Sequence, residues 1–280
     1  MITFMQSTMQ QKDFIGALRS RLKSSFIRDA YWAVGQREKL EFLRQEVRFY
    51  EGALAGFQRG RLIFDIGANV GAKTDVFLRL GARVVAVEPD EACARSLEER
   101  FLGLRISPRP VTIVNRAVSD RVGTEEMLID GPGSAVNTMS PKWAESLKKN
   151  RAEFPYGNFG LEFEQTKLIE TTTIDELMAQ HGVPFFVKID VEGHELSALR
   201  GLNRPVPYLS FEVNLPEFRP EGLQCLQVLA ELAHTGRFNY ASDCARGLRL
   251  TEWLPADEFC AVLERCSEPS IEVFWSTVSV

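Results

Sequence analysis

The sequence predicts an α/β protein: a Rossmann-like, seven-stranded sheet with helices on both faces, preceded by an N-terminal helical segment. From Arg61 onward, short apolar runs alternate with longer amphipathic stretches, which is the pattern of parallel strands joined by helices. The first apolar run ends in a glycine-rich turn that opens a helix. The expected strands are 62–66, 83–88, 111–115, 185–190, 208–213, 237–242 and 271–278. The expected helices are 71–80, 90–101, 173–181, 194–201, 220–235 and 256–266.

Residues 1–58 form an N-terminal extension, and residues 59–280 form the main domain. Residues 12–58 contain no proline and repeat apolar residues at helical spacing. One face of the expected helix carries Leu40, Leu43, Val47, Tyr50 and Leu54. Two interpretations remain open. The extension is either a lid or homodimerisation arm, or a helix packed against the sheet.

An insertion at about residues 125–174 interrupts the alternation of strands and helices. Its ends, Glu125–Ile129 and Leu168–Ile174, are expected to pair as a hairpin, and the stretch between them is rich in glycine, proline and aromatic residues. A long insertion at the ligand edge of a sheet is more often functional than idle.

Composition excludes several classes of function. The net charge of −5 provides no basic surface for nucleic acid. No run approaches the roughly 18 apolar residues of a membrane span, and the first residues lack the apolar core of a signal peptide. Five cysteines, odd in number and without Cys-x-x-Cys spacing, predict reduced thiols in a cytoplasmic protein and argue against a zinc site.

The glycine-rich turn Asp65-Ile-Gly67-Ala-Asn69-Val-Gly71 predicts a ligand site. Glycine has no Cβ, so the main chain at Gly67 and Gly71 is expected to pass close to a ligand. The second strand ends in Glu88, where a carboxylate can accept hydrogen bonds from a ribose diol. Together they predict a nucleoside pocket at the carboxyl edge of the sheet. Alone, the turn is also compatible with an ordinary strand-to-helix connection.

The spacing of the glycines indicates which nucleoside to expect. A dinucleotide site needs Gly-x-Gly-x-x-Gly, and a P-loop needs Lys-Ser/Thr directly after its last glycine. The turn has only Gly67 and Gly71, and neither pattern is present. A nucleoside without a phosphate chain is therefore favoured, and S-adenosylmethionine is the common one. A nicotinamide-dependent oxidoreductase, which shares the sheet and the ribose acid, is the alternative.

Ionisable residues gather at the end of a strand that is otherwise apolar. Lys188 lies within it, and Asp190, Glu192, His194 and Glu195 follow. Groups that converge in this way shift one another's pKa values, as acid–base catalysis requires. Asp190 is the predicted base, with Glu192 and His194 as alternatives, and Lys188 is expected to pair with a carboxylate. Acids at a helix N-terminus also favour the helix dipole, which is the plainer interpretation of Glu192 and Glu195; for His194 it is a capping or solvated role.

Two further segments lie at the same edge. Asp190 with Glu212 or Asn214 could hold Mg²⁺ through oxygen ligands, but a hydrogen-bonded pair without metal is favoured, and no metal ligand is assigned. After the third strand, the small side chain of Ala117 would allow contact with the adenine. Asp120, followed by Gly123, is equally compatible with plain turn chemistry.

At these residues the chain resembles the FkbM-type family of S-adenosylmethionine-dependent methyltransferases. The matching blocks are Asp65 to Gly71, Val87-Glu88-Pro89, Ala117 to Asp120, Thr172 to Leu177 and Lys188 to Glu195. The resemblance implies a class I methyltransferase fold, whose last strand inserts antiparallel, and O-methylation of a hydroxyl on a sugar, glycolipid or polyketide-type acceptor.

The resemblance also implies roles for single residues and a product, S-adenosylhomocysteine. Gly67, Asn69 and Gly71 would line the methionine end of the cofactor, and Glu88 would hold the ribose. The full set of candidate cofactor-binding residues is Asp65, Gly67, Asn69, Gly71, Glu88, Ala117 and Asp190. A non-catalytic protein that binds the cofactor is a further alternative, although binding alone would not need Lys188, Asp190 and Glu192.

Overall fold

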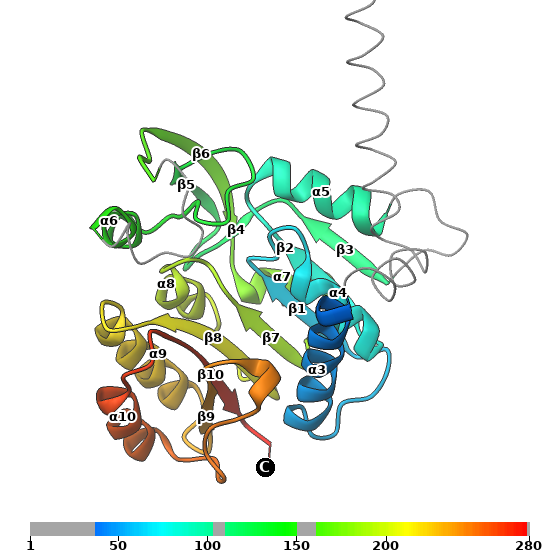
Figure 1. Ribbon diagram of the computed structural model, residues 1–280, viewed down its shortest axis with the longest axis vertical. Coiled ribbons are helices and arrows are strands. Elements are labelled where there is room, and N and C mark those ends of the chain that lie inside the picture. The colour runs from blue at the N-terminus through cyan, green and yellow to red at the C-terminus, as the bar shows by residue number, and fades with distance from the viewer. Residues whose placement is uncertain (1–36, 103–109, 150–160, 279–280) are drawn as a thin grey trace, which may run out of the picture.

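A computed structural model describes residues 37–102, 110–149 and 161–278. A twisted sheet of seven strands runs through the molecule (Figure 1). Its strands are β1 (Leu62–Ile66), β2 (Arg83–Val87), β3 (Val111–Val114), β7 (Phe186–Ile189), β8 (Tyr208–Asn214), β9 (Arg237–Ala241) and β10 (Ser270–Ser276). The helices are α3 (Arg37–Ala53), α4 (Ala72–Leu80), α5 (Glu91–Phe101), α6 (Pro141–Lys149), α7 (Ile174–His181), α8 (Glu195–Arg200), α9 (Arg219–Leu232) and α10 (Ala256–Arg265), with a 3₁₀ turn η1 (Cys244–Arg246).

The strand order confirms the predicted fold class. The order is β3-β2-β1-β7-β8-β10-β9. The pairs from β3 through β8 are parallel, whereas β10 runs antiparallel to both β8 and β9. The late antiparallel insertion expected for a class I methyltransferase is therefore present. The carboxyl ends of β1, β2 and β7 meet at one edge, where β1 and β7 are direct neighbours.

Helices bury both faces of the sheet. The strands carry apolar side chains on both faces, and both faces therefore have to be covered. One core cluster joins the sheet to α3, α4 and α5. The other joins it to α7, α8, α9 and α10. Among the described residues, no helix combines the length and apolar character needed to cross a membrane.

Helix α3, the described part of the N-terminal extension, packs against the sheet. Leu40 and Leu43 of the helix and Leu54 directly after it are buried, and the fully buried ring of Tyr50 lies 5.7 Å from that of Phe186 on β7. This contact fits the packed-helix interpretation for residues 37–53. The rest of the expected lid or dimerisation arm, residues 1–36, lies outside the described residues.

The insertion forms a small second sheet of order β4-β6-β5, made of β4 (Ala117–Val118), β5 (Gly123–Ile129) and β6 (Gln165–Thr172). β5 and β6 are antiparallel. The second strand of this hairpin ends at Thr172, because Thr173 caps α7 by accepting a hydrogen bond from Glu176 N. Helix α6, absent from the sequence-based expectations, starts at Pro141, a residue that suits the first turn of a helix.

Candidate active site

The glycines of the first turn are required by contacts within the protein. Gly67 has φ +78°, and a Cβ there would lie 1.6 Å from the carbonyl oxygen of Asp190. A Cβ on Gly71, at φ +81°, would meet the side chains of Phe101 and Leu97 at 2.5 and 2.7 Å. Protein atoms, and not a ligand, therefore fill the space beside the missing Cβ atoms, while the expected approach of the main chain to a ligand stays a prediction. The glycines let the end of β1 touch the end of β7 and let α4 pack on α5.

Glu88 is buried at the end of β2 and is fixed by main-chain donors. Its Oε2 accepts from Asn69 N and its Oε1 from Asp90 N, both at 2.8 Å. Burial raises the pKa of Glu88 to about 7, although both hydrogen bonds favour the ionised form. A carboxylate oxygen has two lone pairs, so each oxygen retains one for a ribose hydroxyl. The carboxylate thus ties the glycine turn to the start of α5.

Asp65 provides a test of whether the turn suits the predicted cofactor. Its side chain is buried, and its Oδ2 accepts from Thr74 Oγ1 at 2.5 Å. Within the described residues its Oδ1 has no hydrogen-bond partner, and burial raises its pKa. A buried acceptor without a donor is costly in a protein interior. The amino group of a bound methionine moiety is a donor of the required kind, so the residues present fit S-adenosylmethionine.

Asp190 lies immediately after β7 and forms an ion pair with Lys188. Its N–H donates to the carbonyl of Ile66 on β1 at 3.0 Å, and Lys188 Nζ donates to its Oδ2 at 2.7 Å. Burial would raise the pKa of Asp190, but the Lys188 ammonium outweighs it and keeps that pKa below its usual value. Burial would lower the pKa of Lys188, but Asp190 and other nearby carboxylates raise it. Lys188 is 4% exposed, whereas the Asp190 side chain is 33% exposed, so Asp190 is the member of the pair that is open to a ligand.

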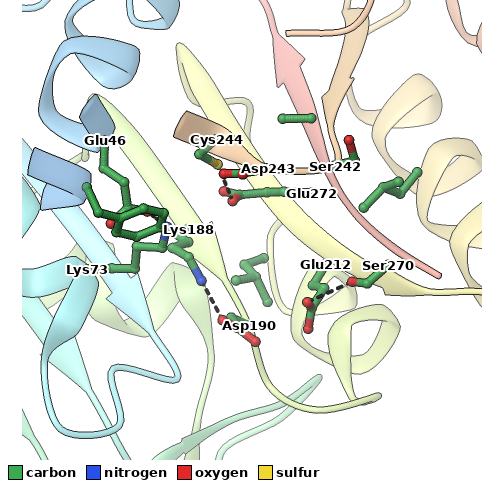
Figure 2. A pocket seen from close by; sticks show the side chains of 14 residues that line it. Glu46, Lys73, Lys188, Asp190, Glu212, Ser242, Asp243, Cys244, Ser270 and Glu272 are labelled. Atoms are coloured by element: carbon green, nitrogen blue, oxygen red, sulfur yellow. Dashed lines mark hydrogen bonds and ion pairs between the residues drawn. The ribbon is translucent and has the colours of Figure 1, made fainter. Parts of the chain in front are cut away.

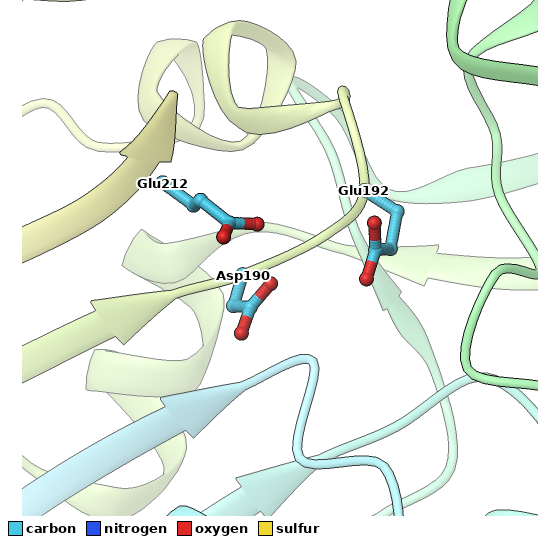
Figure 3. A group of neighbouring side chains, drawn as sticks. All are labelled: Asp190, Glu192 and Glu212. Atoms are coloured by element: carbon cyan, nitrogen blue, oxygen red, sulfur yellow. The ribbon is translucent and has the colours of Figure 1, made fainter. Parts of the chain in front are cut away.

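Three carboxylates converge beside this ion pair (Figure 3). One oxygen from each of Asp190, Glu192 and Glu212 lies within 4.8 Å of the others. Burial and the charge of Asp190 raise the pKa of Glu212 to about 8, and the same two causes raise that of Glu192. Asn214 donates to Glu212 at 3.3 Å. The cluster has the ligand type for a divalent cation and equally the arrangement for carboxylates that share protons.

The other predicted site residues have different surroundings. The Nε2 of His194 lies 3.2 Å from Ser119 Oγ and 3.8 Å from Glu125, so the ring is directed to the small sheet, and burial lowers its pKa. Glu195 accepts from the main chain of its own loop. The side chain of Ala117 is buried in the core of the small sheet, leaving only its main chain for contact with a base.

The insertion contacts the segment after β7 and the start of α5. Thr138 Oγ1 donates to the carbonyl of Glu192 at 2.7 Å, and Asn137 Nδ2 donates to Asp90 Oδ2 at 3.0 Å. Glu192 has φ +53°, an uncommon conformation for a residue with a side chain. The contact with Thr138 holds its peptide group in place. The roles of Asn137 and Thr138 were not predicted, because nothing in the irregular sequence around these two residues indicates a partner.

Asp190 and Glu212 also line a cavity of about 560 Å³ (Figure 2). It lies between α3, the start of α4, β7, β8, β10 and η1. Glu272 on β10 lines this cavity and accepts hydrogen bonds from Tyr50, Ser210 and Cys244. Sequence reasoning missed Glu272. The available signal was an acid between apolar residues in the run Ile271-Glu272-Val273.

A glycine turn against the end of β7, a buried acid at the end of β2 and an antiparallel last strand are the features expected of an S-adenosylmethionine-dependent methyltransferase. The sequence profile described as the methyltransferase FkbM domain matches residues 65–236. The chain belongs to that family.

Solved structures add likeness at low identity. One is a methyltransferase of this class from Agrobacterium tumefaciens (8% identity, 85% of this chain and 62% of that chain covered, TM-score 0.41). Another is a TehB-like methyltransferase from Corynebacterium glutamicum (9% identity, 83% of this chain and 86% of that chain covered, TM-score 0.42). A third is the plantazolicin methyltransferase BpumL in complex with S-adenosylhomocysteine (10% identity, 96% of this chain and 98% of that chain covered, TM-score 0.42). No curated protein sequence matches the chain. Values this low carry no argument about the acceptor.

Proposed function

We propose that this methyltransferase transfers the methyl group to a hydroxyl oxygen of a sugar, glycolipid or polyketide-type acceptor. The observation that carries the proposal is the position of Asp190. Its carboxylate is held by Lys188, and its main chain touches the glycine turn at Gly67. A proton acceptor therefore lies next to the methionine end of the proposed cofactor site.

S-adenosylmethionine, when bound, supplies an activated methyl group on a sulfonium. The chain has to hold the acceptor oxygen in line with that group in a site shielded from water. With the cofactor bound, the acceptor oxygen would take the methyl group, the sulfonium would leave as a neutral thioether that keeps the bond's electron pair, and a carboxylate of the chain would take the hydroxyl proton. Asp190 is ionised at neutral pH because Lys188 lowers its pKa, so it accepts that proton.

Glu192 and Glu212 have raised pKa values and therefore hold protons more tightly than Asp190, so whichever of them is ionised can take the proton onward. His194 has a positioning role in this proposal, since its ring contacts Ser119 and Glu125. A divalent cation in the carboxylate cluster would lower the pKa of the acceptor hydroxyl instead, and removal of metal with a chelator distinguishes the two routes.

The proposed cofactor contacts are local to the glycine turn. Glu88 holds the ribose hydroxyls, Asp65 and the main chain from Gly67 to Gly71 hold the methionine end, and the main chain at Ala117 borders the adenine. All five cysteines are free, which supports the proposal that the enzyme works in a reducing compartment such as the cytoplasm.

Calorimetric titration with S-adenosylmethionine, S-adenosylhomocysteine and NAD⁺ tests the proposal first. We expect micromolar binding of the two sulfur nucleosides and a large loss of both in Glu88→Ala. Glu258→Gln, an exposed acid on α10, is the control and should bind normally. Binding of NAD⁺ alone would return the chain to the oxidoreductases. Tight cofactor binding without turnover on a broad panel of hydroxyl acceptors would indicate a non-catalytic binding protein.

A further inference from the structure

The cavity beside Asp190 is separate from the glycine turn. Its walls include Lys188, Asp190 and Glu212, but no residue of the turn from Gly67 to Gly71 is among its lining residues. Its volume of about 560 Å³ falls within the roughly 300–1,000 Å³ typical of small-molecule pockets. Because Asp190 belongs to both regions, a molecule in the cavity has access to the proposed base.

Negative charge exceeds positive charge in this cavity. Two ammonium groups line it, and each is already paired: Lys73 with Glu46 and Lys188 with Asp190. Five acidic side chains line it in total, those of Glu46, Asp190, Glu212, Asp243 and Glu272. Even with Glu212 protonated, as its pKa of about 8 favours near pH 7, four carboxylates face two ammonium groups. Charge of one sign in a cavity with low-dielectric walls attracts ligands of the opposite sign. A phosphorylated or carboxylated ligand would be repelled.

Two of these carboxylates have only neutral hydrogen-bond donors. Glu272 accepts from the hydroxyls of Tyr50 and Ser210 and from the Cys244 thiol. Glu212 accepts from Ser270 Oγ at 2.9 Å and from the Asn214 amide. No ion pair joins either of them to a lysine or arginine of the described residues.

Glu212 and Glu272 are also direct partners across the antiparallel pair of β8 and β10. Residues directly opposite share one face of the sheet, and like charges there destabilise the pair. A cation placed between the two carboxylates would remove the repulsion, and both side chains line the same open space (Figure 2).

We propose that this cavity binds the methyl acceptor and that the acceptor carries a protonated amine, held between Glu212 and Glu272, beside the hydroxyl presented to Asp190. The inference rests on the proposed function and adds the charge of the acceptor to it. A polyhydroxylated amine of amino-sugar type fits this arrangement, because the side chains of Ser242 and Ser270, which line the cavity, supply partners for the remaining hydroxyl groups. A bare metal ion would leave most of the cavity unfilled.

The test uses matched ligand pairs on the full chain saturated with S-adenosylhomocysteine. Glucosamine and galactosamine are titrated against glucose and galactose, with glucose 6-phosphate as the anionic probe. At pH 7.5 and low salt we expect each amine to bind at least tenfold more tightly than its neutral partner, and the phosphate to bind most weakly. Raising the salt concentration should reduce the preference, because salt screens charge.

Glu272→Gln should reduce the amine preference to near unity while S-adenosylhomocysteine affinity stays within about twofold. Glu258→Gln, outside the cavity, should keep the preference. Thermal melting verifies that both variants fold, and the salt dependence in the natural sequence tests the same point without any substitution.

Several outcomes would overturn the inference. The amines and the neutral sugars could bind equally or not at all, or glucose 6-phosphate could bind more tightly than the amines. Glucosamine could displace S-adenosylhomocysteine. Mg²⁺ could compete with glucosamine and abolish the amine preference. In all of these the proposed methyltransferase function stands if S-adenosylhomocysteine itself binds. Failure of that nucleoside to bind at all is failure of the proposed function.

Discussion

The two halves of the candidate site are built in different ways. The cofactor half, from Asp65 to Asp90, is short in sequence and is held mainly by main-chain hydrogen bonds to Glu88. The acceptor half around Glu272 is assembled from side chains on α3, β7, β8 and β10. The first half depends on backbone conformation, and the second depends on which distant strands become neighbours.

The same contrast governs the two most important carboxylates. Among the described residues, the Glu88 carboxylate accepts only from main-chain N–H groups, so burial dominates and raises its pKa. Asp190 has an ammonium 2.7 Å away, so its pKa is lowered. One acid is therefore poised to titrate near neutral pH, whereas the other stays ionised.

The largest effect should come from Gly67→Ala, because it attacks the contact that joins the two halves. The new Cβ would overlap the main-chain carbonyl of Asp190, which no rotamer change can relieve, so we expect a loss of more than about 4 kcal/mol in the free energy of unfolding. Gly56→Ala is a matched control, since Gly56 has the same φ of +78° and no atom lies within 4 Å of the position that its Cβ would take. It should cost only about 1–2 kcal/mol.

Denaturant unfolding of both variants makes this measurement. Equal losses would mean that backbone strain alone, and not the approach of β1 to Asp190, requires glycine at position 67.

Asp190→Asn should lower turnover by about 10²–10⁴-fold, the usual contribution of a positioned proton acceptor. Asparagine retains a hydrogen-bond acceptor for Lys188 but cannot take the proton. The affinity for S-adenosylhomocysteine should stay within a few-fold, because the cofactor half is unchanged. Asp257→Asn, at an exposed acid on α10, should leave both quantities unaltered. Near-normal turnover in Asp190→Asn would remove Asp190 from the proposed mechanism.

The pH dependence of cofactor binding isolates the other carboxylate. With a pKa of about 7, Glu88 is mostly protonated at pH 6 and mostly ionised at pH 8. The ionised form accepts ribose hydrogen bonds more strongly, so S-adenosylhomocysteine affinity should rise about tenfold over this interval, since the ionised fraction of such a group rises about tenfold. Glu88→Gln should flatten the profile. An unchanged slope in that variant would assign the titration to another group, such as Glu195, whose pKa is also about 7.

The stability of the free protein should move in the opposite direction. The pKa of Glu88 is raised on folding, so the folded state binds more protons than the unfolded state between about pH 4.5 and 7. The contribution of Glu88 to stability is therefore present below its ordinary pKa and is lost as the pH rises through about 7.

Local patterns explain why the sheet and the cofactor half could be predicted. Apolar runs bounded by turns locate β1, β2 and β7 within one or two residues, and the glycines fix where β1 must end. What lies beside those glycines could still not be predicted, because a sequence does not say whether protein or ligand fills the space beside a missing Cβ.

The acceptor half could not be predicted for a topological reason. In the run Ile271-Glu272-Val273, an acid between apolar residues is also what a strand with one solvated face would show. Only the insertion of β10 between β8 and β9 brings Glu272 opposite Glu212 and beneath Tyr50. The surroundings of His194 could not be predicted for a related reason, since its short distance from Asp190 in sequence does not fix the direction of its ring. Its catalytic role stays a prediction.

The smallest effect should come from His194→Gln. The ring contacts Ser119 and Glu125, and glutamine can keep a hydrogen bond to the Ser119 hydroxyl, so we expect turnover to fall by less than about threefold, far below the loss of a general base. The shape of the pH–rate profile should also be unchanged, because burial keeps the imidazole neutral near pH 7 by lowering its pKa. A hundredfold loss, with the disappearance of a limb below pH 6.5, would make His194 the base. It would also show that the loop after Asp190 turns toward the acceptor during turnover, and the division between a cofactor half and an acceptor half would then not hold for the working enzyme.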